Sequence, residues 1–120
     1  LWSNPLYDWD ALQRDGYRWW LERLRAVLRQ VDLLRLDHFR AFEAYWSVPA
    51  TDKTAVNGTW IPGPADSFLA AVRDGLTTGG NLPIIAEDLG MITEPVHALR
   101  RRFDLPGMKV LQFRLPGDPW

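Results

Sequence analysis

Two strand-like apolar runs, each followed by an acidic residue, place the strongest constraint on how this chain can fold. The first run, residues 33–36, is followed by Asp37, and the second, residues 82–86, is followed by Glu87. Side chains alternate along a strand, so Arg35 and Asp37 are expected to point to the same face of the first strand. A cation inside a buried strand needs a nearby anion, and Asp37 is predicted to supply it.

The segments around these runs alternate between helical and strand patterns. Apolar residues recur at three- and four-residue spacing in the predicted helices, and Thr93 suits the N-cap of the last one. The predicted helices cover residues 17–30, 65–77 and 94–103, and the predicted strands cover 31–39, 83–87 and 109–113. Such alternation indicates an α/β fold with parallel strands and right-handed crossovers.

Two further segments are rich in aromatic residues. Residues 2–14 end at the turn signal Asp15-Gly16, and residues 43–64 are interpreted as a long connection. A loop of about 20 residues inside a compact domain is uncommon and usually functional or disordered. The aromatic content of this one argues against disorder.

Polar groups at the carboxyl ends of parallel strands are where catalysis takes place in α/β barrels. Asp37 and Glu87 both lie at such ends. An Asp and a Glu on neighbouring strand ends could form the carboxylate pair of a glycoside-cleaving enzyme. The residues alone also allow a structural ion pair between Arg35 and Asp37, and a surface or helix-capping role for Glu87.

Two sequence motifs resemble a known enzyme family. Arg35-Leu36-Asp37-His38-Phe39-Arg40-Ala41-Phe42 and Ala86-Glu87-Asp88-Leu89-Gly90 resemble the fourth- and fifth-strand signatures of the 4-α-glucanotransferases, which are also called amylomaltases or disproportionating enzymes, of the α-amylase clan. The resemblance begins at Trp2-Ser3-Asn4-Pro5-Leu6-Tyr7 and resumes at residues 105–113, although Ser3 and Ala41 stand where the family has glycine.

The resemblance implies the central part of a (β/α)8 TIM barrel, about strands four to six with their helices. A complete barrel has roughly 250 residues, and this chain has 120. Residues 1–120 are therefore expected to be a fragment of one catalytic barrel domain, incomplete at both ends. The family's third catalytic carboxylate belongs to a His-Asp-Asn motif that this sequence lacks, so it is expected outside this chain. The segment alone is expected to be inactive.

The resemblance also implies the catalytic roles. Asp37 is the expected nucleophile and Glu87 the expected acid/base of a retaining double displacement that transfers α-1,4-glucan segments between maltooligosaccharides or starch chains. Arg35 favours the ionised nucleophile, because a nearby cation stabilises a carboxylate. Asp88, next to Glu87, is expected to support the site through hydrogen bonds.

Several other residues are candidates for substrate binding. An aromatic face packs well against a pyranose ring, although most of the seven tryptophans are expected in the core. His38 lies beside the nucleophile and either contacts sugar hydroxyls or supports the residues that do. The resemblance places Trp2 and Asn4 in an acceptor-side loop. The substrate-binding candidates are His38, Trp2, Asn4, Tyr45, Trp46, Trp60 and Asp88.

Composition argues against other classes of function. The net charge of −1, from 14 basic and 15 acidic residues, gives no electrostatic footprint for nucleic acid or a membrane surface. The chain has no cysteine and two separate histidines, so neither a disulfide scaffold nor a zinc site is expected. No Gly-rich phosphate loop follows a strand, and no apolar run spans a membrane. We expect no metal or cofactor, α-1,4-glucan donors and acceptors as partners, and a cytoplasmic location.

Two alternatives to the transferase remain open at this point. A hydrolase of the same clan would share the chemistry up to the glycosyl-enzyme and would use water as the acceptor. A non-catalytic α-glucan-binding module would need the aromatic side chains but not the carboxylates. The presence of Arg35, Asp37 and Glu87 together favours an enzyme.

Overall fold

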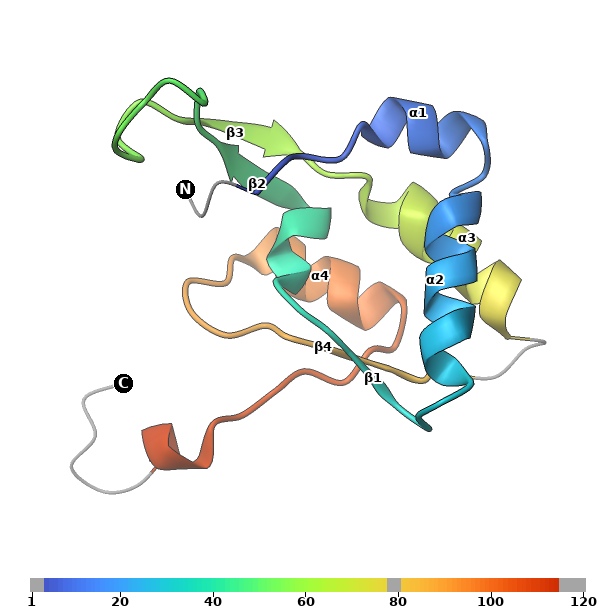
Figure 1. Ribbon diagram of the computed structural model, residues 1–120. Coiled ribbons are helices and arrows are strands. Elements are labelled where there is room, and N and C mark those ends of the chain that lie inside the picture. The colour runs from blue at the N-terminus through green and yellow to red at the C-terminus, as the bar shows by residue number, and fades with distance from the viewer. Residues whose placement is uncertain (1–3, 78–80, 115–120) are drawn as a thin grey trace.

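The structure is a computed structural model that describes residues 4–77 and 81–114 of the chain. The elements form two separate two-stranded sheets together with several helices (Figure 1). In chain order they are α1 (Trp9–Arg14), α2 (Arg18–Leu28), β1 (Leu34–Leu36), η1 (Phe39–Phe42), β2 (Ala44–Ser47), β3 (Thr59–Pro62), α3 (Ala65–Leu76), β4 (Ile84–Ala86), α4 (Glu94–Arg102) and η2 (Leu111–Arg114), where η denotes a 3₁₀ helix.

Strands β1 and β4 form a parallel pair. Leu34 pairs with Ile84 and Leu36 pairs with Ala86, so the carboxyl ends of both strands lie at the same edge. Parallel strands need a crossover connection, and the segment between these two strands contains α3. The predicted α/β class with parallel strands is therefore confirmed.

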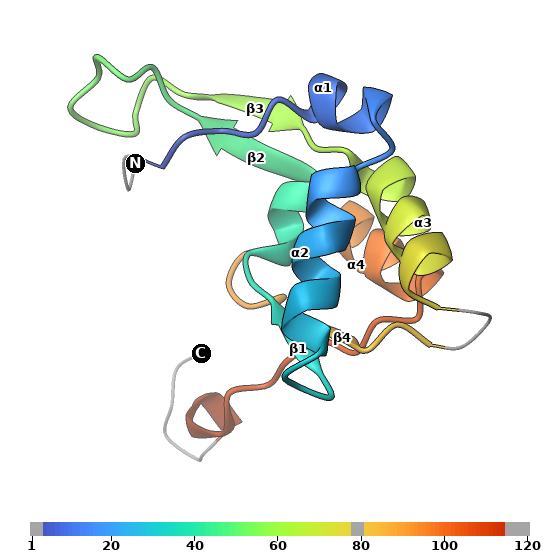
Figure 2. The same ribbon diagram turned by 45° about the vertical axis from the view of Figure 1, so that its right-hand side comes forward.

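The predicted helices 17–30, 65–77 and 94–103 correspond to α2, α3 and α4. Helices α2 and α3 lie side by side (Figure 2). Their contact includes a hydrogen bond of 2.6 Å between the hydroxyls of Tyr17, just before α2, and Ser67 on α3. Thr93 is the N-cap of α4 as predicted, although its side chain makes no capping hydrogen bond.

The core gathers aromatic side chains from α2, η1 and α3. Phe42 stacks on Phe68 with ring centroids 4.8 Å apart, and Trp20 meets Phe68 edge-on at 5.3 Å. Such offset and edge-on contacts contribute beyond the burial of apolar area. Ile84 and Ala86 of β4 are buried against the same cluster. The end of the sheet that carries the acidic residues is thus packed on the hydrophobic core.

Two predictions about secondary structure were wrong, and one helix was not predicted. Residues 43–64 are not one irregular connection, because β2 and β3 pair antiparallel in a hairpin with Trp46 opposite Trp60. Residues 2–14 contain α1, whose N-cap Asp8 accepts a hydrogen bond from the main chain of Ala11. Residues 109–113 do not form a strand: the chain bonds to β4 earlier, at Pro106, and then enters η2.

Candidate active site

Asp37 and Glu87 occupy equivalent positions at the ends of the two parallel strands. Asp37 follows Leu36, Glu87 follows Ala86, and these two preceding residues are paired in the ladder. The main-chain N–H of Glu87 donates to the carbonyl of Leu36 over 3.0 Å. Neighbouring strands lie about 4.8 Å apart, so this register makes the two acidic residues direct neighbours.

The carboxylate of Glu87 is held by two main-chain donors. The N–H of His38 donates to Oε2 over 2.8 Å, and the N–H of Leu89 donates to Oε1 over 3.0 Å. His38 reaches this position with a left-handed backbone, φ 49° and ψ 48°, which is uncommon for a residue other than glycine. The half-buried side chain of Glu87 is therefore fixed beside the residue that follows Asp37.

Arg35 and Asp37 form the predicted ion pair. The prediction that this pair lies inside a buried strand was wrong, because the Arg35 side chain is 48% exposed and that of Asp37 is 71% exposed. The face of β1 that carries Arg35 is therefore open to solvent in the described part of the chain. Charge pairs in such surroundings contribute little to stability, which leaves orientation of Asp37 as the main effect of Arg35.

Asp88 turns away from Glu87 and lies against the protein interior, with 8% of its side chain exposed. Its Oδ1 accepts from the N–H of Met108 over 2.8 Å, and its Oδ2 lies 3.1 Å from Nε of Arg100 on α4. A Cβ on Gly107 would overlap this carboxylate. Asp88 thus ties α4 and residues 107–108 to the end of β4, as the expected supporting residue would. A direct contact with sugar stays a prediction.

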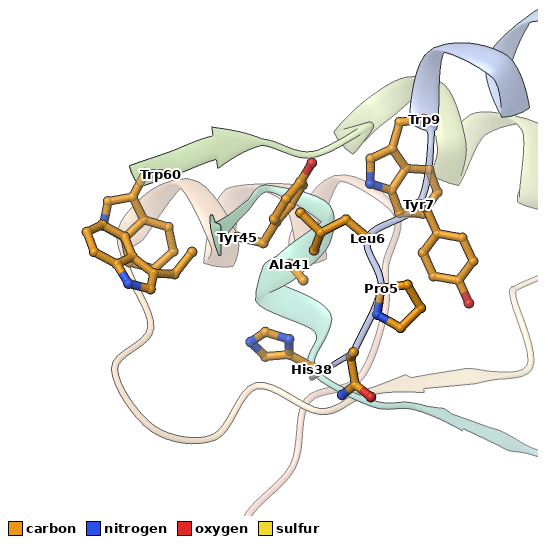
Figure 3. A pocket seen from close by; sticks show the side chains of 10 residues that line it. Pro5, Leu6, Tyr7, Trp9, His38, Ala41, Tyr45 and Trp60 are labelled. Carbon is orange, nitrogen blue, oxygen red and sulfur yellow. The ribbon is translucent and has the colours of Figure 1, made fainter. Parts of the chain in front are cut away.

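A pocket of about 270 Å³ opens beside His38, between the N-terminal segment and the β2–β3 hairpin. Figure 3 shows the His38 ring at one side of this space and Trp60 at another, with Tyr45 between the hairpin and the N-terminal segment. The pocket is lined by Asn4, Pro5, Leu6, Tyr7, Trp9, His38, Ala41, Tyr45, Trp46 and Trp60. The structure therefore brings five of the seven predicted substrate-binding residues together.

The other two candidates differ in their position. Asp88 does not line the pocket, and Trp2 lies outside the described residues. Sequence reasoning did not name Tyr7 or Trp9 as binding candidates, since most of the tryptophans were expected in the core. Trp9 does contact core rings, including Phe68 at 5.8 Å, but it also lines the pocket. The aromatic content of residues 2–14 was the signal that could have indicated this second role.

The pocket walls are held by contacts among the aromatic residues themselves. Trp46 and Trp60 meet at 63° with ring centroids 5.4 Å apart, and Nε1 of Trp46 donates to the carbonyl of Ala55 over 2.9 Å. A second hollow, of about 520 Å³, shares Asn4 and Pro5 with the first and also includes Lys53. The two hollows together follow the N-terminal segment from Trp9 to Asn4 and reach the residues that come after β2.

Two further observations concern residues 4–77 and 81–114 only. No three His, Cys, Asp or Glu side chains gather there as a metal site would require. No helix there is both long enough and apolar enough to span a membrane.

Comparison with known proteins decides the family. Residues 1–119 match the sequence profile of a family described as 4-alpha-glucanotransferase. The chain belongs to the 4-alpha-glucanotransferase family. It is 52% identical over 118 residues to a 4-alpha-glucanotransferase of Synechocystis sp., a match that covers 98% of this chain and 23% of that relative. It is 51% identical over 112 residues to the 4-alpha-glucanotransferase of Thermus thermophilus, covering 93% of this chain and 22% of the relative.

A solved structure from the 4-alpha-glucanotransferase family also resembles this chain. The amylomaltase from Streptococcus agalactiae, determined in complex with acarbose, superposes with a TM-score of 0.86 at 39% identity. The match covers 94% of this chain and 22% of the amylomaltase chain. The chain thus spans about a quarter of the length of the curated relatives that it matches.

Proposed function

We propose that the full-length protein containing this chain is a 4-α-glucanotransferase that moves α-1,4-glucan segments between maltooligosaccharides or starch chains. Asp37 acts as the nucleophile and Glu87 as the acid/base. The chain provides about strands four to six of a (β/α)8 barrel, and the third carboxylate comes from outside these 120 residues. Family membership and the amylomaltase fold support this assignment.

The observation that carries the proposal is the register of β1 against β4. Pairing of Leu36 with Ala86 puts Asp37 and Glu87 side by side on adjacent parallel strands. Adjacent strands lie about 4.8 Å apart, and retaining glycosidases need carboxyl groups about 5–5.5 Å apart. An inverting enzyme needs a wider gap, of about 6.5–9.5 Å, to hold a water molecule. Neighbouring strand positions therefore favour retention.

The reaction follows from this arrangement in two steps. A carboxylate oxygen of Asp37 attacks the anomeric carbon, the glycosidic C–O bond breaks, and its electron pair goes to the leaving oxygen, which takes a proton from Glu87. In the second step an acceptor sugar hydroxyl gives its proton to Glu87 and attacks the anomeric carbon. The bond between this carbon and the Asp37 oxygen breaks, and Asp37 is released as a carboxylate. Arg35 pairs with Asp37 and orients its carboxylate for the attack in the first step.

The pocket beside His38 supports a glucan as the substrate. Its aromatic side chains, including Tyr45, Trp46 and Trp60, offer flat faces for pyranose rings. Asn4 and His38 add polar groups that can hydrogen-bond sugar hydroxyls. A related amylomaltase was solved with acarbose bound.

Product analysis after incubation of maltotriose with the full-length protein tests the proposal. Glucose together with maltotetraose and longer chains would establish transfer. Glucose and maltose alone would mean that water is the acceptor and that the protein is a hydrolase. Unchanged maltotriose from a folded protein that still binds it would favour a non-catalytic glucan-binding module.

A further inference from the structure

Arg40 is a basic side chain near the site that the proposed chemistry does not use. It lies on η1, three residues after Asp37. Its guanidinium carbon sits 4.4 Å from the ring centroid of Trp60 on β3. Its NH1 donates over 2.9 Å to the carbonyl of Met91, in the segment that follows Glu87. One side chain thus contacts both the hairpin and the loop beyond the acid/base.

The chemistry of the side chain matters for this double contact. A guanidinium is planar, so it can lie over an aromatic ring and still donate in its own plane. The Nε of Arg40 is buried and has no hydrogen-bond partner among the described residues. A buried donor without a partner is unfavourable, so the stacking on Trp60 and the bond to Met91 account for the placement of this residue.

We propose that Arg40 is a positioning residue that sets the Trp60 wall of the pocket for a sugar ring. Trp60 and Trp46 contact each other and line the pocket, whereas Arg40 lies outside the lining. Arg40 therefore acts on the substrate through Trp60. This inference rests on the proposed glucan substrate, and it adds a residue that fixes where the sugar stacks.

A double-mutant cycle in the full-length protein tests the inference. Arg40→Lys keeps the charge but removes the planar group, and it should raise KM for maltotriose by about 3- to 30-fold while changing kcat less than KM. In a Trp60→Ala background the same substitution should change KM by less than about twofold, because its target is gone. If Arg40→Lys does not fold, Arg40→Gln gives the same cycle.

Arg73→Lys is the matched control, since Arg73 lies 5.6 Å from the ring centroid of Phe103 and away from the pocket. It should leave KM unchanged. The inference would be overturned if the effects of Arg40→Lys and Trp60→Ala on KM were additive. It would also be overturned if Arg40→Lys behaved as Arg73→Lys does.

A failure of the proposed function gives a different result from a failure of this inference. If the wild-type protein leaves maltotriose unchanged, the transferase assignment has failed, and the same cycle is measured as maltotriose affinity by calorimetry. Coupling of Arg40 to Trp60 in that affinity would support the positioning role. Additive effects, or an affinity too weak to detect in the wild type, would overturn it.

Discussion

The main-chain N–H of His38 donates to Oε2 of Glu87 over 2.8 Å, and this bond joins the end of β1 to the end of β4. The proposed nucleophile, Asp37, immediately precedes His38. The left-handed backbone of His38, with φ 49°, directs its N–H towards the other strand. The same short turn therefore carries the proposed nucleophile and orients the proposed acid/base.

Replacement of the acid/base should abolish turnover without abolishing binding. Glu87→Gln keeps the shape of the side chain but removes the ionisable proton, and general acid–base catalysis contributes about 10²- to 10⁴-fold. We expect kcat for maltotriose to fall by this amount, with maltotriose affinity by calorimetry nearly unchanged. Glu94→Gln, on the exposed first turn of α4, is the matched control and should keep full activity. Normal turnover by Glu87→Gln would contradict the assignment.

Covalent trapping should identify the nucleophile. A retaining enzyme forms a glycosyl-enzyme, so a fluorinated glucosyl fluoride that slows the second step should label Asp37. Mass spectrometry of a digest would locate the added sugar. Asp32, which precedes β1, provides the matched control. The Asp32→Asn protein should still carry the sugar on Asp37, whereas the Asp37→Asn protein should carry none. A label on any other residue would remove Asp37 from the nucleophile role.

Removal of the Trp60 ring should weaken sugar binding. Trp60→Ala should raise KM for maltotriose by roughly 3- to 30-fold, the range that corresponds to loss of one stacking aromatic side chain. Trp19→Ala is a fair control, because Trp19 is 47% exposed and Trp60 is 53% exposed, but Trp19 does not line the pocket. Equal effects of the two substitutions on KM would argue against a sugar site at Trp60.

A side chain at position 107 should destabilise the protein. A Cβ there would overlap the Asp88 carboxylate, which the hydrogen bond from the Met108 N–H and the ion pair with Arg100 hold in place. Gly107→Ala should cost about 1–3 kcal/mol of unfolding free energy and lower the thermal midpoint. A Cβ at Gly75 in α3 would meet the end of the Leu21 side chain, which can shift, and the Arg25 guanidinium at an ordinary contact distance, so Gly75→Ala should be neutral or stabilising. An unchanged midpoint for Gly107→Ala would contradict the close packing seen here.

The 120-residue chain should be inactive by itself. Its described parallel sheet has two strands, whereas a complete (β/α)8 barrel closes with eight. Apolar side chains such as Leu33 and Leu111 are exposed, and exposed apolar patches promote aggregation. We expect no turnover of maltotriose by the purified segment at any enzyme concentration that stays in solution. Measurable transfer would contradict this expectation.

The sequence predicted the parts of the fold that local periodicity determines. Helices α2, α3 and α4 each bury one apolar face, and β1 and β4 coincide with the centres of the predicted strands 31–39 and 83–87. Sequence also put Asp37 and Glu87 at strand ends, because the acidic residues interrupt those runs. These features depend on local pattern and on general rules for parallel sheets.

The remaining features depend on contacts that periodicity does not report. Strands β2 and β3 have four residues each, too few for alternation to be distinctive, and only their pairing makes them a hairpin. The segment Lys109-Val110-Leu111-Gln112-Phe113 has strand-like composition, but a strand also requires a neighbour with free backbone groups. The hydrogen bond from the His38 N–H to the Glu87 carboxylate depends on the left-handed backbone of His38. No residue type in the motif predicts that backbone conformation.

The separate pairing of the β2–β3 hairpin has a consequence for how such enzymes can be varied. Within the described residues these strands pair with each other and not with β1 or β4. The connection between them, the eleven residues 48–58, can therefore change in length while the β1–β4 ladder beside Asp37 and Glu87 keeps its register. This connection is a natural position for grafting loops from related enzymes. Such grafts could change the preference for long or short glucan chains while the reaction itself is preserved.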